Sequence, residues 1–337
     1  MGSTRRIVLA SRPKGAPGPE NFRLEDIVLA DANEGEVTLR VLYLSLDPYM
    51  RGRMSDAKSY AAPVPIDGIM EGETVCEVIS SRHPGFSPGE IVRGRTGWCS
   101  HAVMQGDRLR LVETHGAPIS TAVGVLGMPG FTAWSGLKFI GQPKQGETVV
   151  VAAASGPVGS MVGQLAKMAG ARAVGIAGGL DKCTFVKEEL GFDAVVDHRS
   201  TDFARDLERA CPNGIDVYFE NVGGHVWDAV LPQLNQFARI PVCGLVAQYN
   251  GGETADSDRL PMTMSTILRR SLLLRGFIQT EFVADHFDSF LNEVGPKVAS
   301  GQIKHREDVV DGLDNAPEAF TGMLTGKNFG KLIVKVA

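Results

Sequence analysis

The sequence is poor in cysteine, and its cysteines follow no pattern. There are five, an odd number, and no two of them form a CxxC pair. They stand far apart, at Cys76, Cys99, Cys183, Cys211 and Cys243. No Asn-x-Ser/Thr acceptor for N-glycosylation occurs either. These absences argue against a disulfide framework and favour a reducing compartment, so we expect a cytoplasmic protein.

Histidines at metal-ligand spacing are also absent. The seven histidines include no HxxxH pair and no CxxH pair, whereas metal sites need such ligands at coordinating spacings. Near the C-terminus, GMLTGKN has one residue too few between its glycines for a phosphate-binding P-loop. The sequence therefore predicts no metal centre and no P-loop chemistry.

Long apolar runs and basic clusters are missing as well. No run approaches the roughly 18 apolar residues of a membrane span. The chain carries 34 Lys and Arg against 39 Asp and Glu, a net charge of −5, and no basic cluster exceeds a pair. Arg5 and Arg6 precede an apolar stretch that is too short for a twin-arginine signal. We expect neither nucleic acid nor a membrane among the partners.

What the chain does contain is a set of β and βα patterns punctuated by glycine. With 337 residues it should hold about two domains. From Arg5 to about Gly116, short β-like runs indicate a small, mostly antiparallel β domain. From about Thr121, strand-like runs alternate with amphipathic helical segments. The predicted fold class is therefore α/β, with a Rossmann doubly wound parallel sheet domain and a separate β-rich domain.

The strongest local signal is ETVVVAAASGPVGSMVGQLAKMAG, a buried strand that runs into a glycine turn and a helix. Gly156 lets the backbone approach a pyrophosphate, and Gly159 lets the helix pack on the strand, while the helix N-terminus offers free N–H groups. Ala154 replaces the first glycine of GxGxxG. On the turn alone, a dinucleotide site and a purely structural βα turn are about equally supported.

The next strand favours a dinucleotide that carries a 2′-phosphate. A site for NAD usually has an acidic residue about 20 residues past the glycine turn. Here RAVGIA ends in Gly178 and Gly179, with Lys182 shortly after. A glycine pair leaves room for a phosphate and a cation neutralises it, which indicates NADPH. The alternative for Lys182 is a solvated lysine in the first turn of a helix.

A second turn, DVYFENVGG, ends a further buried strand at Asn221. Because ligands of doubly wound sheets bind outside the carboxyl ends of the strands, Asn221 is placed to meet the cofactor. The competing interpretation is an asparagine that caps the following helix.

Without metal ligands, hydride chemistry requires a neutral hydrogen-bond donor near a substrate carbonyl, and tyrosine suits this. Of the five tyrosines, Tyr43 and Tyr218 lie in apolar strand patterns and are expected in the core. Tyr49, Tyr60 and Tyr249 lie in loop-like stretches and are the catalytic candidates. A surface or packing role is the alternative, above all for Tyr60.

Seven motifs in order carry a family resemblance over nearly the whole chain. They are LSLDPYMRGRM, GMPGFTAW, AAASGPVGSMVGQLAK, GFDAVVDHR, DVYFENVGG, ARIPVCGLVAQYN and GKNFGKLIVK. Together they resemble the zinc-independent medium-chain dehydrogenases/reductases that include prostaglandin and leukotriene reductases, plant alkenal double-bond reductases and bacterial NADPH-dependent curcumin reductases. The zinc-dependent alcohol dehydrogenases of the same superfamily carry a ligating Cys and a later GHE, where this chain has LSLDPYM and IMEGET.

The resemblance implies a GroES-like substrate domain made of residues 1–122 and 303–337, with a Rossmann NADP-binding domain of residues 123–302 inserted between them. It also implies a homodimer. The tail agrees with this organisation, since it contains a predicted helix over Ala316–Leu324 and a final apolar run, KLIVKV. Tyr49 and Tyr249 match tyrosines implicated in substrate handling. The implied cofactor contacts are Met128, Thr132, Gly156, Pro157, Val158, Gly159, Gly179, Lys182, His198, Asn221, Cys243, Gly244, Tyr249, Phe277 and Asn328.

The function implied is NADPH-dependent reduction of the activated C=C bond of α,β-unsaturated ketones or aldehydes. A hydride goes to the β-carbon, and Tyr249 and Tyr49 polarise the carbonyl. Quinone reduction with the same cofactor is the alternative activity, and a non-catalytic NADPH-binding protein is a more distant one. His198 stands where relatives often have a tyrosine, which leaves its role and that of Arg199 open.

Overall fold

The computed structural model describes residues 3–251 and 259–337, and internal contacts divide the chain into two units. One combines Met1–Gly124 with Glu307–Ala337, and we call it the terminal unit because it contains both ends of the chain. The other, Val125–Arg306, is the central unit.

The central unit is built on a six-stranded sheet in which every neighbouring pair of strands is parallel. Its order is β10–β9–β8–β11–β12–β13, which in chain order reads 3-2-1-4-5-6, the doubly wound order of the Rossmann fold. The strands are β8 (Thr148–Ala152), β9 (Arg172–Ala177), β10 (Ala194–Asp197), β11 (Ile215–Phe219), β12 (Leu234–Val242) and β13 (Leu273–Gly276).

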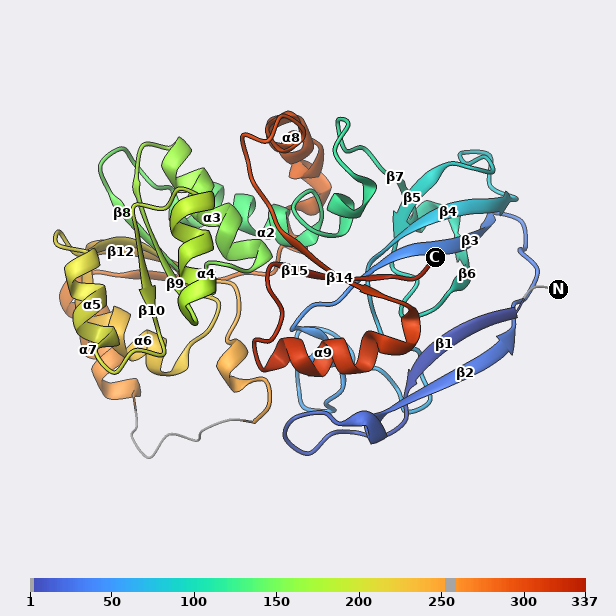
Figure 1. Ribbon diagram of the computed structural model, residues 1–337, viewed down its shortest axis with the longest axis horizontal. Coiled ribbons are helices and arrows are strands. Elements are labelled where there is room, and N and C mark those ends of the chain that lie inside the picture. The colour runs from blue at the N-terminus through green and yellow to red at the C-terminus, as the bar shows by residue number, and fades with distance from the viewer. Residues whose placement is uncertain (1–2, 252–258) are drawn as a thin grey trace. The chain divides into compact units, whose positions relative to one another are not determined.

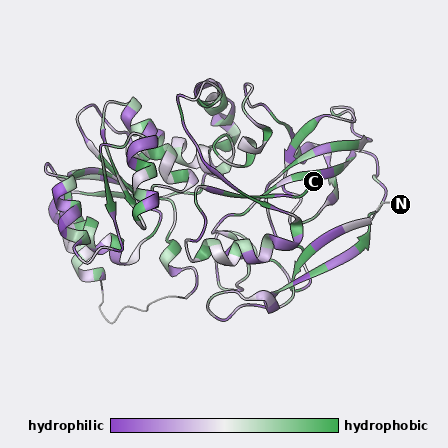
Figure 2. Cartoon of the chain, viewed as in Figure 1, coloured by the Kyte–Doolittle hydropathy of each residue, from purple (hydrophilic) through white to green (hydrophobic). Residues whose placement is uncertain are grey.

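Helices alternate with these strands, as the colour sequence from green to orange in Figure 1 shows. The α-helices are α2 (Met128–Gly136), α3 (Pro157–Met168), α4 (Leu180–Thr184), α5 (Phe203–Ala210), α6 (Gly224–Val230), α7 (Leu260–Arg270) and α8 (Thr280–Ala299). Shorter helical turns are η4 (Leu137–Gly141), η5 (Phe185–Glu189), η6 (Leu231–Gln233) and η7 (Val246–Gln248). Strand β8 is buried along its whole length. Its run of valines suits this position, because a central parallel strand is covered by helices on both faces. Its hydrophobic colour in Figure 2 contrasts with the charged stretches of α5.

The terminal unit is mostly β. Its larger sheet has the order β14–β15–β3–β4–β5–β7, with β6 also paired to β3, and only the β14–β15 pair is parallel. Strands β1 and β2 form a separate antiparallel hairpin. The strands are β1 (Ser3–Leu9), β2 (Phe22–Val28), β3 (Glu36–Ser45), β4 (Thr74–Ser81), β5 (Ile91–Gly94), β6 (His101–Gln105), β7 (Arg110–Leu111), β14 (Glu307–Asp311) and β15 (Lys331–Lys335). The predicted fold class, a parallel α/β sheet with a separate β-rich domain, is confirmed.

Helical segments of the terminal unit are short. They are η1 (Pro19–Asn21), α1 (Met50–Arg53), η2 (Gly106–Arg108), η3 (Ile119–Val123), η8 (Leu313–Asn315) and α9 (Ala316–Leu324). The predicted helix over Ala316–Leu324 is thus confirmed. Phe320 of α9 packs edge-on against Trp98, which in turn stacks on Phe22 with ring centroids 5.7 Å apart. One aromatic cluster therefore joins the N-terminal, middle and C-terminal parts of this unit.

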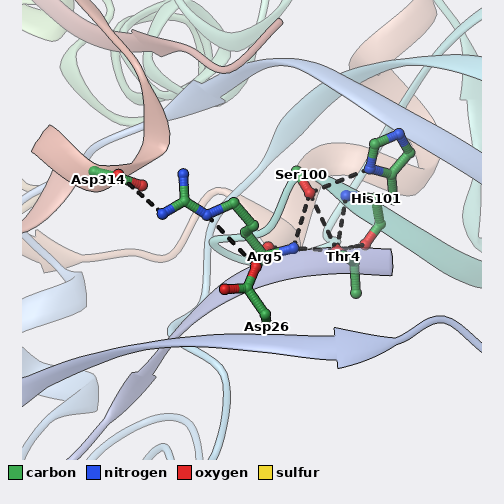
Figure 3. A network of polar contacts seen from close by, with 6 residues as sticks. All are labelled: Thr4, Arg5, Asp26, Ser100, His101 and Asp314. Carbon is green, nitrogen blue, oxygen red and sulfur yellow. Dashed lines mark hydrogen bonds and ion pairs between the residues drawn. The ribbon is translucent and has the colours of Figure 1, made fainter. Parts of the chain in front are cut away.

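A polar network fixes the first strand to the rest of the terminal unit (Figure 3). The Thr4 hydroxyl donates to the His101 carbonyl at 2.8 Å and accepts from the His101 amide at 3.0 Å. The Arg5 amide donates to Ser100 Oγ at 3.0 Å, and the Arg5 guanidinium reaches Asp314 of η8 at 3.0 Å. Both ends of the chain are therefore tied into one structure. In the described part of the chain, no helix combines the length and apolar character of a membrane span.

Candidate functional site

The carboxyl ends of β8 and β11 define the place where a ligand is expected. Strand order reverses between these two neighbours, which makes the position between them the topological switch point of the sheet. Asn221, two residues past β11, donates from its amide Nδ2 to the Ala152 carbonyl at the end of β8, over 2.9 Å. The alternative that Asn221 caps the following helix is wrong, because α6 begins after Gly223 and has no side-chain cap.

The glycine turn after β8 leads directly into α3. Gly156 is the extended residue that precedes the helix, and Pro157 occupies its first position. A Cβ atom on Gly159 would lie 2.8 Å from Ala154 Cα and closer still to the Ala153 carbonyl oxygen, so only glycine fits there. The first N–H groups of α3, including that of Val158, have no carbonyl partner within the helix. Close packing and N–H groups without a helical partner are the features expected of a pyrophosphate-binding turn.

The tips of β9 and β10 lie side by side, because these strands are neighbours in the sheet. A Cβ atom on Gly178 would lie 2.6 Å from His198 Nε2 and 3.0 Å from Arg199 Nε, and one on Gly179 would lie 3.3 Å from Arg199 Nη1. Gly179 also has φ +91°, a conformation that favours glycine. The glycine pair is therefore the surface against which the guanidinium of Arg199 rests.

Asp197 organises these two tips. Its Oδ1 accepts hydrogen bonds from the Gly179 amide at 3.0 Å and from the Arg199 amide at 2.9 Å. Burial favours the neutral acid, but these two backbone donors outweigh it and hold the pKa of Asp197 below its ordinary value. The carboxylate of Asp197 thus links the backbone after β9 to the backbone after β10.

His198 and Lys182 flank the same tips. Burial, with the nearby charges of His225 and Arg199, lowers the pKa of His198, and its ring lies 5.4 Å from that of His225. The neutral imidazole is therefore the favoured form near pH 7. Lys182 is half-buried in α4.

Glu220, a residue that sequence reasoning missed, shapes the end of β11. It is 2% exposed, and its Oε1 accepts hydrogen bonds from the Tyr218 hydroxyl (3.0 Å) and from the amides of Val222 (2.7 Å) and Gly223 (2.9 Å). Burial raises its pKa despite these donors. Tyr218 is fully buried, as predicted for a core residue.

The segment from Cys243 to Tyr249 is fastened to the same turn. The amides of Cys243 and Gly244 both donate to the Glu220 carbonyl, over 2.9 and 3.2 Å. Burial raises the pKa of the Cys243 thiol to about 12, so it stays protonated. Tyr249 follows η7, and its hydroxyl oxygen lies 3.0 Å from the position of a Cβ atom on Gly244. The glycine therefore allows the phenol to lie close to the backbone.

Three further predicted contacts lie in packed surroundings. The Thr132 hydroxyl donates to the Met128 carbonyl within α2 at 2.7 Å. Phe277 is 5% exposed, and its ring packs edge-on against Phe219 of β11. Thr132 and Phe277 thus contribute to the packing of the central unit.

The other predicted residues belong to the terminal unit. Tyr49 directly precedes α1, and burial, with the charge of Asp47, raises the pKa of its phenol well above the usual range. Tyr60 is 62% exposed. Asn328 donates from Nδ2 to the Gly330 carbonyl at 2.9 Å, just before β15.

The structure thus brings the predicted residues together in three groups. Gly156, Asn221 and the segment from Cys243 to Tyr249 surround the switch point. Gly179, Lys182 and His198 surround the tips of β9 and β10. Tyr49 and Tyr60 lie near each other in the terminal unit, where one arginine contacts both rings. Arg199, whose role the sequence left open, belongs to the second group, because its guanidinium lies against Gly178 and Gly179.

A parallel sheet of this order, with a glycine turn at its switch point and a β-rich unit from both chain ends, defines a medium-chain type of dinucleotide-binding oxidoreductase. A family model described as the N-terminal domain of oxidoreductase matches residues 5–112, and one described as zinc-binding dehydrogenase matches residues 157–294. Among residues 3–251 and 259–337, no three or more His, Cys, Asp or Glu side chains form a group that could hold a metal ion.

Known proteins resemble the chain over its full length. It is 54% identical over 334 residues to the NADPH-dependent curcumin reductase of Escherichia coli (strain K12), covering 99% of this chain and 97% of that protein. It is 36% identical over 345 residues to the NADP(+)-dependent 2-alkenal reductase of Nicotiana tabacum, covering 99% and 98%. The solved structure of CurA in complex with NADPH from Vibrio vulnificus superposes with a TM-score of 0.95 at 52% identity, covering 99% of both chains. The chain belongs to the medium-chain dehydrogenase/reductase family of NADPH-dependent curcumin and alkenal reductases.

The packing at Gly159 yields a prediction about the glycine turn. We expect Gly159→Ala to destabilise the protein by about 1–3 kcal/mol, because the added methyl group overlaps the backbone of Ala153 and Ala154. Urea unfolding and thermal melting measure this change. Gly276→Ala is the matched control, since a Cβ atom there meets nothing within 4 Å. If Gly159→Ala and Gly276→Ala melted at the same temperature, the backbone of the turn would have to accommodate the methyl group without loss of stability, which would contradict the prediction.

Proposed function

We propose that this oxidoreductase uses NADPH to reduce the activated C=C bond of α,β-unsaturated ketones and aldehydes. The observation that carries the proposal is the full-length similarity to an enzyme named as an NADPH-dependent curcumin reductase. The similarity to a 2-alkenal reductase supports the same class of substrate. Reduction of a conjugated C=C bond is the chemistry that these two relatives share.

The residues at the sheet edge fit NADPH. The N–H groups of the first turn of α3 suit the pyrophosphate, at Gly156, Pro157, Val158 and Gly159. Gly179, Lys182, His198 and Arg199 suit the adenosine 2′-phosphate, since a glycine surface faces a guanidinium there. The remaining contacts that we propose are Met128, Thr132, Asn221, Cys243, Gly244, Tyr249, Phe277 and Asn328. The cofactor domain would be residues 123–302, and residues 1–122 with 303–337 would form the substrate domain.

When bound, NADPH supplies the hydride for the β-carbon of the substrate. The role of the chain is to hold the substrate carbonyl and to stabilise the negative charge that develops on its oxygen. We assign this to the hydroxyls of Tyr249 and Tyr49. Tyr60, the remaining catalytic candidate, would contact the substrate through its ring. The raised pKa of Tyr49 keeps its phenol protonated and able to donate.

We propose further that the reaction needs no metal and that the enzyme is a cytoplasmic homodimer. Metal independence is supported by the segments IMEGET and LSLDPYM, which stand where zinc-dependent relatives have zinc ligands. The cytoplasmic location is supported by the five cysteines, which follow no disulfide or metal-binding pattern. The resemblance described above supports the dimer.

The activity itself is tested by following NADPH oxidation. We expect turnover with enones, enals and a curcuminoid, unchanged by EDTA, and a saturated product identified by mass spectrometry. Quinones form the comparison set, because quinone reduction is the alternative activity. A kcat/KM for quinones well above that for every enone would overturn the assignment of substrate class.

Tyr249→Phe tests the polarising hydroxyl. Losing one donor to a developing oxyanion costs about 3 kcal/mol, so kcat for an enone should fall by roughly 10²-fold. The affinity for NADPH, measured by fluorescence titration, should change much less. Tyr43→Phe, in strand β3, is the matched control. Full turnover by Tyr249→Phe removes this residue from the mechanism.

Lys182→Ala and Arg199→Ala test the phosphate site. Each variant removes a charged donor worth about 1.5–3 kcal/mol, so the Kd for NADPH should rise by roughly 10- to 100-fold. The Kd for NADH should barely change, because NADH lacks the 2′-phosphate. Lys187→Ala is the control, since Lys187 donates to the Asp193 carbonyl instead. Equal loss of affinity for both dinucleotides would contradict the phosphate assignment.

A further inference from the structure

Arg53 of the terminal unit lies between the two tyrosines proposed for substrate handling. Arg53 is 3% exposed, although moving a guanidinium from water into the protein interior costs free energy. The guanidinium carbon lies 4.3 Å from the ring centroid of Tyr60 and 5.8 Å from that of Tyr49. Both distances fall within the range of cation–π attraction. Arg53 is therefore in contact with both rings at once.

The hydrogen bonds of Arg53 hold the chain on either side of Tyr60. Its Nη1 donates to the Ala61 carbonyl at 3.2 Å and to Ser59 Oγ at 3.4 Å. Its own carbonyl accepts from the Val64 amide at 2.8 Å. These three bonds hold the segment from Ser59 to Val64 against α1, and so they hold the backbone that carries the Tyr60 ring.

The charge of Arg53 is only loosely compensated. The nearest carboxylate, Glu71, lies 3.6 Å from Nε, and its side chain is 42% exposed. A second pair, Arg95 and Glu73, is separated by 3.7 Å. The buried guanidinium of Arg53 makes no tight salt bridge with Glu71. Its position is explained by its hydrogen bonds to the segment around Tyr60 and by its contacts with the two tyrosine rings.

Tyr60 is packed on one side and open on the other. One face of the ring lies on Arg53, and 62% of the residue is exposed. A flat, exposed aromatic face is suited to stacking on a planar conjugated molecule. Stacking requires the ring but not the hydroxyl, which separates this role from donation to a carbonyl.

We propose that Arg53 is a positioning residue, which holds Tyr60 so that its open ring face stacks on the aromatic substituent of a conjugated enone. This deepens the proposed function and rests on it. Tyr60 then determines specificity through its ring, and the planar guanidinium of Arg53 acts through Tyr60. Lysine cannot replace it, because an ammonium lacks the planar shape and the paired donors.

The test compares two enones that differ only in the group on the β-carbon, phenyl in benzylideneacetone and methyl in ethylideneacetone. We expect Tyr60→Leu to raise KM for benzylideneacetone by about tenfold, as loss of one stacking contact implies, with kcat little changed. KM for ethylideneacetone should stay within about twofold in Tyr60→Leu. Tyr60→Phe keeps the ring, so it should keep the wild-type ratio of the two KM values. Arg53→Lys should reproduce the Tyr60→Leu pattern.

A double-variant cycle then separates positioning from general damage. Arg53→Lys combined with Tyr60→Leu should be no worse than Tyr60→Leu alone, because the arginine acts through the ring. Arg40→Lys is the control, since Arg40 lies on strand β3 and pairs with Glu77 of the neighbouring strand β4. NADPH affinity and melting temperature check that each variant is folded.

Two results would overturn the inference. Additive losses in the double variant would mean that Arg53 acts independently of Tyr60, and equal impairment by Tyr60→Phe and Tyr60→Leu would assign the effect to the hydroxyl. The second comparison needs only substitutions of an exposed residue, so it can overturn the stacking role of Tyr60, on which the role of Arg53 depends, even if Arg53→Lys fails to fold. Failure of the wild type to reduce either enone would instead refute the proposed function itself.

Discussion

The carboxylate of Glu220 is the group on which the switch point depends. A parallel sheet must leave the space beyond β8 and β11 open for a ligand, yet the polar backbone at the end of β11 still needs partners. Glu220 supplies them from inside, through three hydrogen bonds to a single oxygen. Its backbone carbonyl also holds the amides of Cys243 and Gly244. A buried carboxylate is tolerated only with such bonds, so the turn and the carboxylate stabilise each other.

The terminal unit also contains a buried charged pair whose hydrogen bonds hold a loop in place. Lys331 of β15 donates to Asp47 Oδ1 at 2.9 Å and to the Leu46 carbonyl at 2.7 Å, and Ser45 donates to the other carboxylate oxygen of Asp47. The side chains of Lys331 and Asp47 are 3% and 6% exposed. Removing one partner of such a pair leaves an uncompensated charge at a cost of about 3–5 kcal/mol. The last strand of the chain thereby fixes the loop that leads to Tyr49.

Local patterns predicted those parts of the structure that depend on neighbours in sequence. The alternation of strands and helices gave the parallel sheet, the spacing of Gly156 and Gly159 gave the turn, and the helix over Ala316–Leu324 lies where it was expected. Asn221 was ambiguous between a cofactor contact and a cap for the following helix, because an asparagine at a strand end suits either role. The structure excludes the cap, since α6 has no side-chain cap and the amide of Asn221 donates to the Ala152 carbonyl.

Glu220 and Arg53 were missed, and the role of Arg199 was left open, for a common physical reason. Each acts on residues that the fold brings near: Arg199 on a glycine pair of the neighbouring strand, Glu220 on a segment from the next strand, and Arg53 on a loop that folds back over its helix. Glu220 and Arg53 are buried, whereas a charged residue in a sequence is ordinarily exposed and nothing local marks it as buried. Strand order supplies the missing information for Arg199 and Glu220.

The interaction of Asp47 with Lys331 also bears on the carbonyl-polarising role that we propose for Tyr49. The carboxylate of Asp47 raises the pKa of Tyr49, in the same direction as burial. An unpaired carboxylate in this position would be expensive to bury, and Lys331 offsets that cost. A phenol kept neutral remains a donor across the working pH range, whereas a tyrosinate would repel an oxygen that gains negative charge. The same ion pair therefore stabilises the loop and holds Asp47 near Tyr49, whose neutral phenol is the form that the proposed polarisation of a carbonyl requires.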